Sequence, residues 1–175
     1  AGYTIRRGFF TKHIFGAAYS YIKIADSVID KRYNPNYFGD SVSSKGLFDL
    51  NYRLQYANVD NGSYPLKGKT AFVALQKRGL GFTGGVNMFM VEAGWNRYYD
   101  LGKKWYGIAQ VFGSIKLPFD QAYINQRGFG YGENYLRGLE YYVIDGVATA
   151  LIKSTIKKKL LSVNIPFKYF PKLLT

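Results

Sequence analysis

Apolar and polar residues alternate along several stretches of the chain, and this period of two predicts β-strands. In the clearest stretch, from Phe48 to Tyr56, the even positions are Phe, Leu or Tyr and the odd positions are Asp, Asn, Arg or Gln. Successive side chains of a strand point to opposite faces, so one face is apolar and the other polar. Weaker alternation elsewhere brings the predicted strands to residues 11–26, 46–60, 68–78, 85–99, 104–117 and 146–161, with another beginning near Phe167.

The length of these strands is informative. Strands of soluble proteins usually span about five or six residues, whereas a strand that crosses a bilayer at a tilt needs about 9–11. The pattern therefore favours an all-β fold, an antiparallel transmembrane β-barrel, in which the apolar face points outward. Aromatic residues at several strand ends suit the interfacial girdle of such a barrel; they are Tyr56, Tyr64, Trp95, Tyr98, Tyr99, Trp105 and Tyr106.

The predicted connections differ in length between the two ends of the sheet. Antiparallel strands place every other connection at the same end, which groups residues 27–45, 79–84 and 118–145 at one end and residues 61–67 and 100–103 at the other. Both long connections belong to the first group. Outer-membrane barrels combine long extracellular loops with short periplasmic turns, so the first group is predicted to be extracellular.

Composition narrows the class of protein further. The chain has 175 residues, no Cys, one His and a net charge of +13. It therefore lacks the residues for a disulfide framework, a thiol nucleophile or a multi-His metal site, and no metal or cofactor is predicted. The positive charge would suit binding to nucleic acid, to an anionic membrane or to lipopolysaccharide. No nucleic-acid-binding motif is present, so nucleic acid is not predicted as a partner.

Residues 130–146, with the sequence GYGENYLRGLEYYVIDG, resemble the signature loop of the BamA/TamA superfamily of outer-membrane barrels, also called the bacterial surface antigen family. The likeness is strongest to the TamA-like branch of the Bacteroidetes. The family's periplasmic turn is resembled by a second motif, made of Asp60, Tyr64, Pro65 and Gly68. A third motif that resembles the family lies in the first long loop of this chain and consists of Asn34-Pro35-Asn36-Tyr37-Phe38. The three motifs occur in the family's order and at the ends of the sheet that strand alternation requires.

The resemblance implies roles for particular residues. In the family the signature loop folds into the barrel, where its Arg contacts the inner wall. Carried over, Arg137 is this contact, Gly138 allows a tight backbone, Leu139 replaces the usual Phe or Tyr, and Glu140 follows. A bidentate pair between such an Arg and a wall carboxylate would hold the loop in place.

Two further sets of residues are weaker candidates. Arg127-Gly128-Phe129 matches the three-residue core of the signature with less similar surroundings. Glu92, Lys153 and Lys157 lie on the polar side of the alternation and are predicted to line the lumen wall. Glu92 is also a weak candidate for the partner of Arg137.

The family barrel has sixteen strands, so residues 1–175 would form part of one barrel domain, about strands seven to twelve, with the signature loop at 118–145 and no POTRA domain. The resemblance implies a non-enzymatic factor that helps insert or export proteins at the outer membrane of a Gram-negative bacterium. Its partners would be outer-membrane lipids and lipopolysaccharide, substrate outer-membrane proteins or lipoproteins, and periplasmic or membrane subunits of a larger complex. The alternatives are a passive porin-like or structural barrel and a soluble lipocalin-like ligand-binding barrel.

Overall fold

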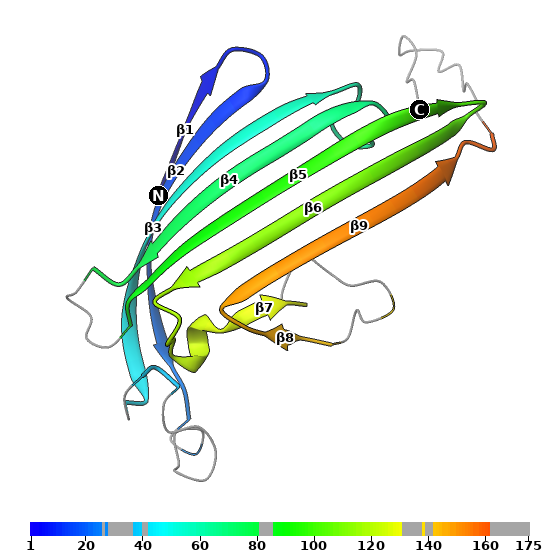
Figure 1. Cartoon of the computed structure of the whole chain (residues 1–175). Helices are drawn as coiled ribbons and strands as arrows, with labels where there is room; N and C mark the ends of the chain where they lie inside the picture. Colours follow the sequence, from blue (N-terminus) through cyan, green and yellow to red (C-terminus); the bar gives the residue numbers. More distant parts are fainter. Residues whose placement is uncertain are drawn as a thin grey trace, which may run out of the picture.

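The computed structural model describes residues 1–25, 27, 37–39, 42–80, 86–130, 138 and 142–161. Most of the described residues belong to a single antiparallel sheet in the order β1-β2-β3-β4-β5-β6-β9 (Figure 1). The strands are β1 (Gly2–Arg7), β2 (Thr11–Lys23), β3 (Ser44–Val59), β4 (Gly68–Arg78), β5 (Met88–Gly102), β6 (Trp105–Leu117) and β9 (Ala148–Lys158). The prediction of an all-β, antiparallel fold is confirmed.

Three short elements lie between β6 and β9 in the chain. They are the 3₁₀ turn η2 (Tyr123–Asn125) and the strands β7 (Arg127–Phe129) and β8 (Ile144–Asp145). The last two pair with each other in a separate two-stranded sheet. The long connection predicted over residues 118–145 therefore contains short ordered elements.

Two other differences from the predicted strands are clear. The sequence pattern missed β1, which pairs with β2 from Gly2 opposite Gly16 to Arg7 opposite Thr11. The turn predicted at residues 100–103 is displaced, because β5 continues through a bulge to Gly102. The turn itself is made by Lys103 and Lys104, whose φ angles of 51° and 66° match the left-handed residues of a two-residue hairpin turn. The strand proposed near Phe167 lies outside the described residues.

Short turns lie at one end of the sheet and longer connections at the other. β1 and β2, β3 and β4, and β5 and β6 are joined at the short-turn end, by residues 8–10, 60–67 and 103–104. The remaining connections, between β2 and β3, β4 and β5, and β6 and β9, leave from the opposite end, which we call the long-loop end (Figure 1). The asymmetry of lengths expected from the sequence is therefore present in the fold.

The strand register divides the sheet into an apolar and a polar face. Leu50, Tyr52 and Leu54 of β3 lie beside Leu75 and Val73 of β4 on one face, and this apolar face continues across the sheet through Val91, Trp95, Val111 and Ile152. The polar face carries the intervening residues, among them Asp49, Arg53, Gln76, Glu92, Gln110 and Lys153.

Exposure is inverted relative to a water-soluble sheet. Along β9, exposure alternates so that Ile152 and Ile156 are 80% and 69% exposed while Lys153 and Lys157 are only partly exposed. The sheet curves around its polar face, on the side where η2, β7 and β8 lie (Figure 1). The apolar face is thus the outer, uncovered surface of the described structure.

The buried core lies on the polar side of the sheet, near the long-loop end. It consists of Phe38, Leu47, Val86 and Ile124, so that one strand residue packs against three residues from different connections. The described residues of these connections therefore pack over the polar face.

Within the described residues, no helix has the length and apolar character needed to span a membrane.

Candidate functional site

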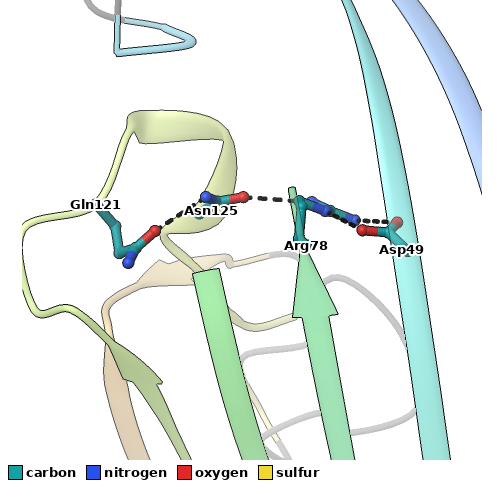
Figure 2. Close-up of polar contacts among 4 residues, drawn as sticks. All are labelled: Asp49, Arg78, Gln121 and Asn125. Atoms are coloured by element: carbon teal, nitrogen blue, oxygen red, sulfur yellow. Dashed lines mark hydrogen bonds and ion pairs between the residues drawn. The ribbon is translucent and has the colours of Figure 1, made fainter. Parts of the chain in front are cut away.

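The candidate site is the place where residues 118–130 dock on the polar face. Its centre is an ion pair between the neighbouring strands β3 and β4. Arg78 donates from Nε to Asp49 Oδ1 at 2.8 Å and from a terminal guanidinium nitrogen to Oδ2 at 3.0 Å, a bidentate pair (Figure 2). The Asp49 residue is 7% exposed. Such a two-pronged contact fixes both the position and the orientation of the guanidinium group.

The remaining guanidinium nitrogen extends this pair into the loop. It donates to Asn125 Oδ1 at 3.3 Å, and Asn125 Nδ2 donates in turn to Gln121 Oε1 at 2.9 Å (Figure 2). Gln121 Nε2 donates to the carbonyl oxygen of Pro118 at 2.6 Å. Both amide side chains are nearly buried, with exposures of 6% for Gln121 and 3% for Asn125. A continuous chain of polar contacts therefore joins the sheet to η2.

Lys116 of β6 makes a second connection between the sheet and the loop. It is 4% exposed, and its ammonium group donates to the carbonyl oxygens of Arg127 and Gly146, the latter at 3.3 Å. The first carbonyl belongs to β7, and the second follows β8 directly. A buried ammonium group is costly without such acceptors, so the position of β7 and β8 is coupled to this residue of the sheet.

Arg127-Gly128-Phe129, the weaker match to the signature, forms β7. Phe129 is 7% exposed, and its ring centroid lies 6.0 Å from that of Phe112 on the polar face. Gly128 leaves no space for a side chain, because an added Cβ would lie 2.4 Å from the carbonyl oxygen of Ile144. The structure thus brings this tripeptide against the polar face of the sheet.

Most residues of the stronger match to the signature, 130–146, lie outside the described part of the chain. Arg137, Leu139 and Glu140 lie outside the described residues, and Gly138 has a φ of +83°. Of the Asn-Pro-Asn-Tyr-Phe motif, Tyr37 and Phe38 are described. Phe38 is fully buried in the core, and the backbone N–H of Ile124 donates to the carbonyl oxygen of Tyr37 at 3.1 Å. Two connections thus meet over the polar face.

The predicted periplasmic turn is organised around Asp60. Its Oδ1 accepts hydrogen bonds from the backbone N–H groups of Asn61, Leu66 and Lys67 at 2.9 to 3.1 Å. Partial desolvation raises the pKa of this carboxyl, but the hydrogen bonds from Leu66, Lys67 and Asn61 outweigh it and lower the pKa below the usual value. Gly68 has a φ of +113°, and a Cβ there would lie 2.1 Å from the Asn58 carbonyl oxygen.

The turn also contacts the neighbouring strand β5 and reaches across the polar face to β9. Lys67 Nζ lies 2.6 Å from Asp100 Oδ2 of β5, which raises the pKa of Lys67, first through this hydrogen bond and then through the opposite charge. Tyr64 is 54% exposed, and Lys157 Nζ of β9 lies 4.1 Å from its ring centroid. Three strand spacings of about 4.8 Å separate β4 from β9, so the turn leans over the concave side. Pro65 in the same turn is partly buried.

The three predicted lumen-wall residues share the polar face. Glu92 lies on β5, opposite Ala74 and Ser114, while Lys153 and Lys157 lie on β9. Lys153 lines a hollow of about 350 Å³ together with Arg53, Gln55, Thr70, Asn96 and Gln110. Two of the lining residues contact each other, since Asn96 Nδ2 donates a hydrogen bond to Thr70 Oγ1 at 2.9 Å. The hollow is therefore polar and carries two cationic side chains.

Sequence reasoning missed the central pair of the site. Asp49 had no partner that the sequence pattern could identify, and Arg78 was assigned no role. The register supplies the missing signal, since the two residues lie directly opposite each other and the turn at 60–67 fixes that register. Within the described part of the chain, no group of three or more His, Cys, Asp or Glu residues is placed to hold a metal ion.

Searches against protein-family models, curated proteins and solved structures gave no match to this chain.

Proposed function

We propose that this chain forms part of the wall of an outer-membrane β-barrel of the BamA/TamA type, whose long loop is anchored inside the lumen and which helps insert or export proteins. The observation that carries the proposal is the inverted exposure of the sheet. Apolar residues such as Ile152 are exposed on the convex face, while the polar face is partly covered by connections. That arrangement suits lipid outside and water inside.

Curvature favours this proposal over the lipocalin-like alternative. A soluble ligand-binding barrel would enclose its apolar face and expose its polar face. Here the sheet curves around the polar side, where Phe129 packs on Phe112 and the turn at 60–67 meets Lys157 (Figure 1). Covering the convex apolar face with hydrocarbon would remove the exposed side chains from water, which is favourable by about 25 cal/mol per Å².

The role in protein insertion rests on the loop and on the resemblance of residues 130–146. The loop is anchored through Asn125 to Arg78, whose bidentate pair with Asp49 lies within the sheet. It thus provides a fixed internal element, which a passive pore does not need. A porin-like channel is the second candidate, and the polar hollow lined by Arg53 and Lys153 favours it, since such a lining would suit passage of small anionic solutes.

Excision of residues 128–140 tests the two candidates against each other. The protein extracted from its native membranes and the excised variant would be reconstituted into vesicles, and insertion of an outer-membrane protein substrate and ion conductance would both be measured. An insertion factor should lose substrate insertion while its unheated form keeps its compact mobility on a denaturing gel. If insertion is unchanged and only conductance changes, the porin-like candidate is correct.

A further inference from the structure

One rim of the apolar face carries three cations, each placed over an aromatic ring. Lys69 Nζ lies 5.6 Å from the ring centroid of Tyr56, the Arg97 guanidinium carbon lies 5.5 Å from that of Tyr99, and Lys158 Nζ lies 4.9 Å from that of Trp105. The pairs are distributed over β3 to β6 and β9. All are near the short-turn end, and we call these six residues the basic–aromatic rim.

The cations of this rim lie on the outer face and not in the lumen. Lys69 is directly opposite Arg97 across β4 and β5, in the same register row as Ala109. Lys158 is directly opposite Trp105 across β6 and β9. All three cationic residues are exposed. They therefore continue the apolar face toward the short-turn end.

The facing pair of Lys69 and Arg97 is unfavourable by itself, because like charges directly opposite each other in a sheet repel. Among the described residues, no carboxylate forms an ion pair with either of them. The residues of the seven strands on the apolar face include no Asp or Glu. The repulsion would be relieved by an anion that approaches from outside the protein.

The two ends of the apolar face also differ in charge. The short-turn end carries Arg7 in addition to the three cations of the rim, whereas the long-loop end carries Lys23 and Lys77. Between the two ends, no charged Lys, Arg, Asp or Glu residue of the strands lies on this face. The strongest positive strip thus follows the boundary of the apolar band, at the depth where the headgroups of a membrane leaflet would lie.

We propose that the basic–aromatic rim binds the phosphate groups of anionic glycerophospholipids, such as phosphatidylglycerol, in the leaflet at the short-turn end. This inference rests on the proposed function, since it requires the apolar face to contact lipid. Aromatic side chains of this kind favour the interface, and Lys and Arg beside them extend their charged ends toward the headgroups. A phosphate seated between Lys69 and Arg97 would screen their mutual repulsion.

A lipid-competition experiment on the extracted protein tests the proposal. A bimane label on Ala109→Cys lies on the apolar face in the row of Arg97. The protein would be reconstituted with phosphatidylcholine or phosphatidylglycerol brominated on the acyl chains, and relative binding would be obtained from the quenching of the label. The rim variant combines Lys69→Gln, Arg97→Gln and Lys158→Gln. The matched control combines Lys12→Gln, Arg53→Gln and Lys153→Gln on the polar face, with the same change in charge.

The expected result is stronger quenching by brominated phosphatidylglycerol in the parent and control proteins, and equal quenching by both lipids in the rim variant. A cation near an anionic lipid surface contributes about 1 kcal/mol. Removal of each cation should therefore reduce the preference for phosphatidylglycerol by about fivefold. Equal quenching in all three proteins would overturn the proposal, as would a preference that survives in the rim variant or one that is lost in the control. Displacement of the brominated lipid by lipopolysaccharide but not by phosphatidylglycerol would overturn the choice of lipid.

Failure of the proposed function gives a different result. If neither brominated lipid quenches the label in any of the proteins, the apolar face does not contact lipid, and both the barrel-wall proposal and the rim proposal fall. If both lipids quench equally, the barrel-wall proposal stands and only the rim proposal falls.

Discussion

Asp49 and Arg78 face each other across β3 and β4 and form a bidentate ion pair that also holds Asn125 of the loop. Arg78 thus has two partners of different kinds: Asp49 within the sheet and Asn125 on the connection that covers it. Desolvation of a carboxylate is costly, and a planar guanidinium group compensates by supplying several donors in a fixed geometry. The wall and the loop are therefore coupled through one side chain.

Arg78→Lys should loosen this coupling while keeping the charge. An ammonium group cannot reproduce the two contacts to Asp49 and the third to Asn125. We expect the free energy of unfolding, measured by urea titration in detergent, to fall by about 1.5–3 kcal/mol, as for hydrogen bonds to charged groups. Arg97→Lys is the matched control on the apolar face, with an expected change within about 0.5 kcal/mol. Equal effects of the two substitutions would contradict the role of Arg78.

Gly128→Ala should detach β7 from β8. The added Cβ would lie 2.4 Å from the carbonyl oxygen of Ile144, so the two strands must separate, at a cost of about 1–3 kcal/mol. Limited proteolysis within residues 118–130 should become faster, while the seven-stranded sheet remains folded. Gly62→Ala provides the control, because nothing lies within 4 Å of a Cβ at that position. Unchanged proteolysis of the Gly128 variant would show that β7 does not depend on this close approach.

The turn at 60–67 should depend on pH through Asp60. Because its pKa is lower in the folded chain than the usual 3.8, ionisation of Asp60 stabilises the turn above that pH, and the contribution is lost as the pH falls through the lower folded value. Hydrogen-exchange protection of the Leu66 and Lys67 amides should therefore persist below pH 3.8 and then decline.

The same turn contains an internal control for this titration. The amides of Ser63 and Tyr64 donate to Oδ1 of Asn61, at 2.9 and 3.2 Å, and this side chain does not titrate. Their protection should change less than that of Leu66 and Lys67. A parallel decline at all four amides would indicate that the whole turn unfolds for another reason.

Much of the sheet was predictable because apolar and polar residues alternate along its strands, strictly in part of β3 and more weakly elsewhere. Phe48 to Tyr56 predicted the core of β3, and the turn around Asp60 and Gly68 separated it from β4. β1 was missed because Gly2–Arg7 is short and ends in Arg6 and Arg7, which place a charge on each face. The pattern therefore gave little contrast there.

The site was less predictable than the sheet, for a physical reason. Asp49 and Arg78 each lie ten residues from the closing pair of the turn, Val59 and Gly68, so their meeting follows from the register once the turn is known. The loop contacts have no such rule. Asn125 and Gln121 dock through individual side-chain contacts that carry no sequence period, so only the three-dimensional structure reveals them.

We expect lipid to cover the apolar face of the sheet while water fills the polar side. Val111 and Gln110 are consecutive residues of β6 that point to opposite faces, and the chain has no native Cys. Bimane labels on Val111→Cys and Gln110→Cys in the membrane-reconstituted protein would be tested with spin-labelled lipids and with aqueous iodide. We expect the lipid to quench only the label at 111 and iodide to quench preferentially the label at 110. A label at 111 that does not respond to the lipid, or a label at 110 that does, would contradict this arrangement of lipid and water.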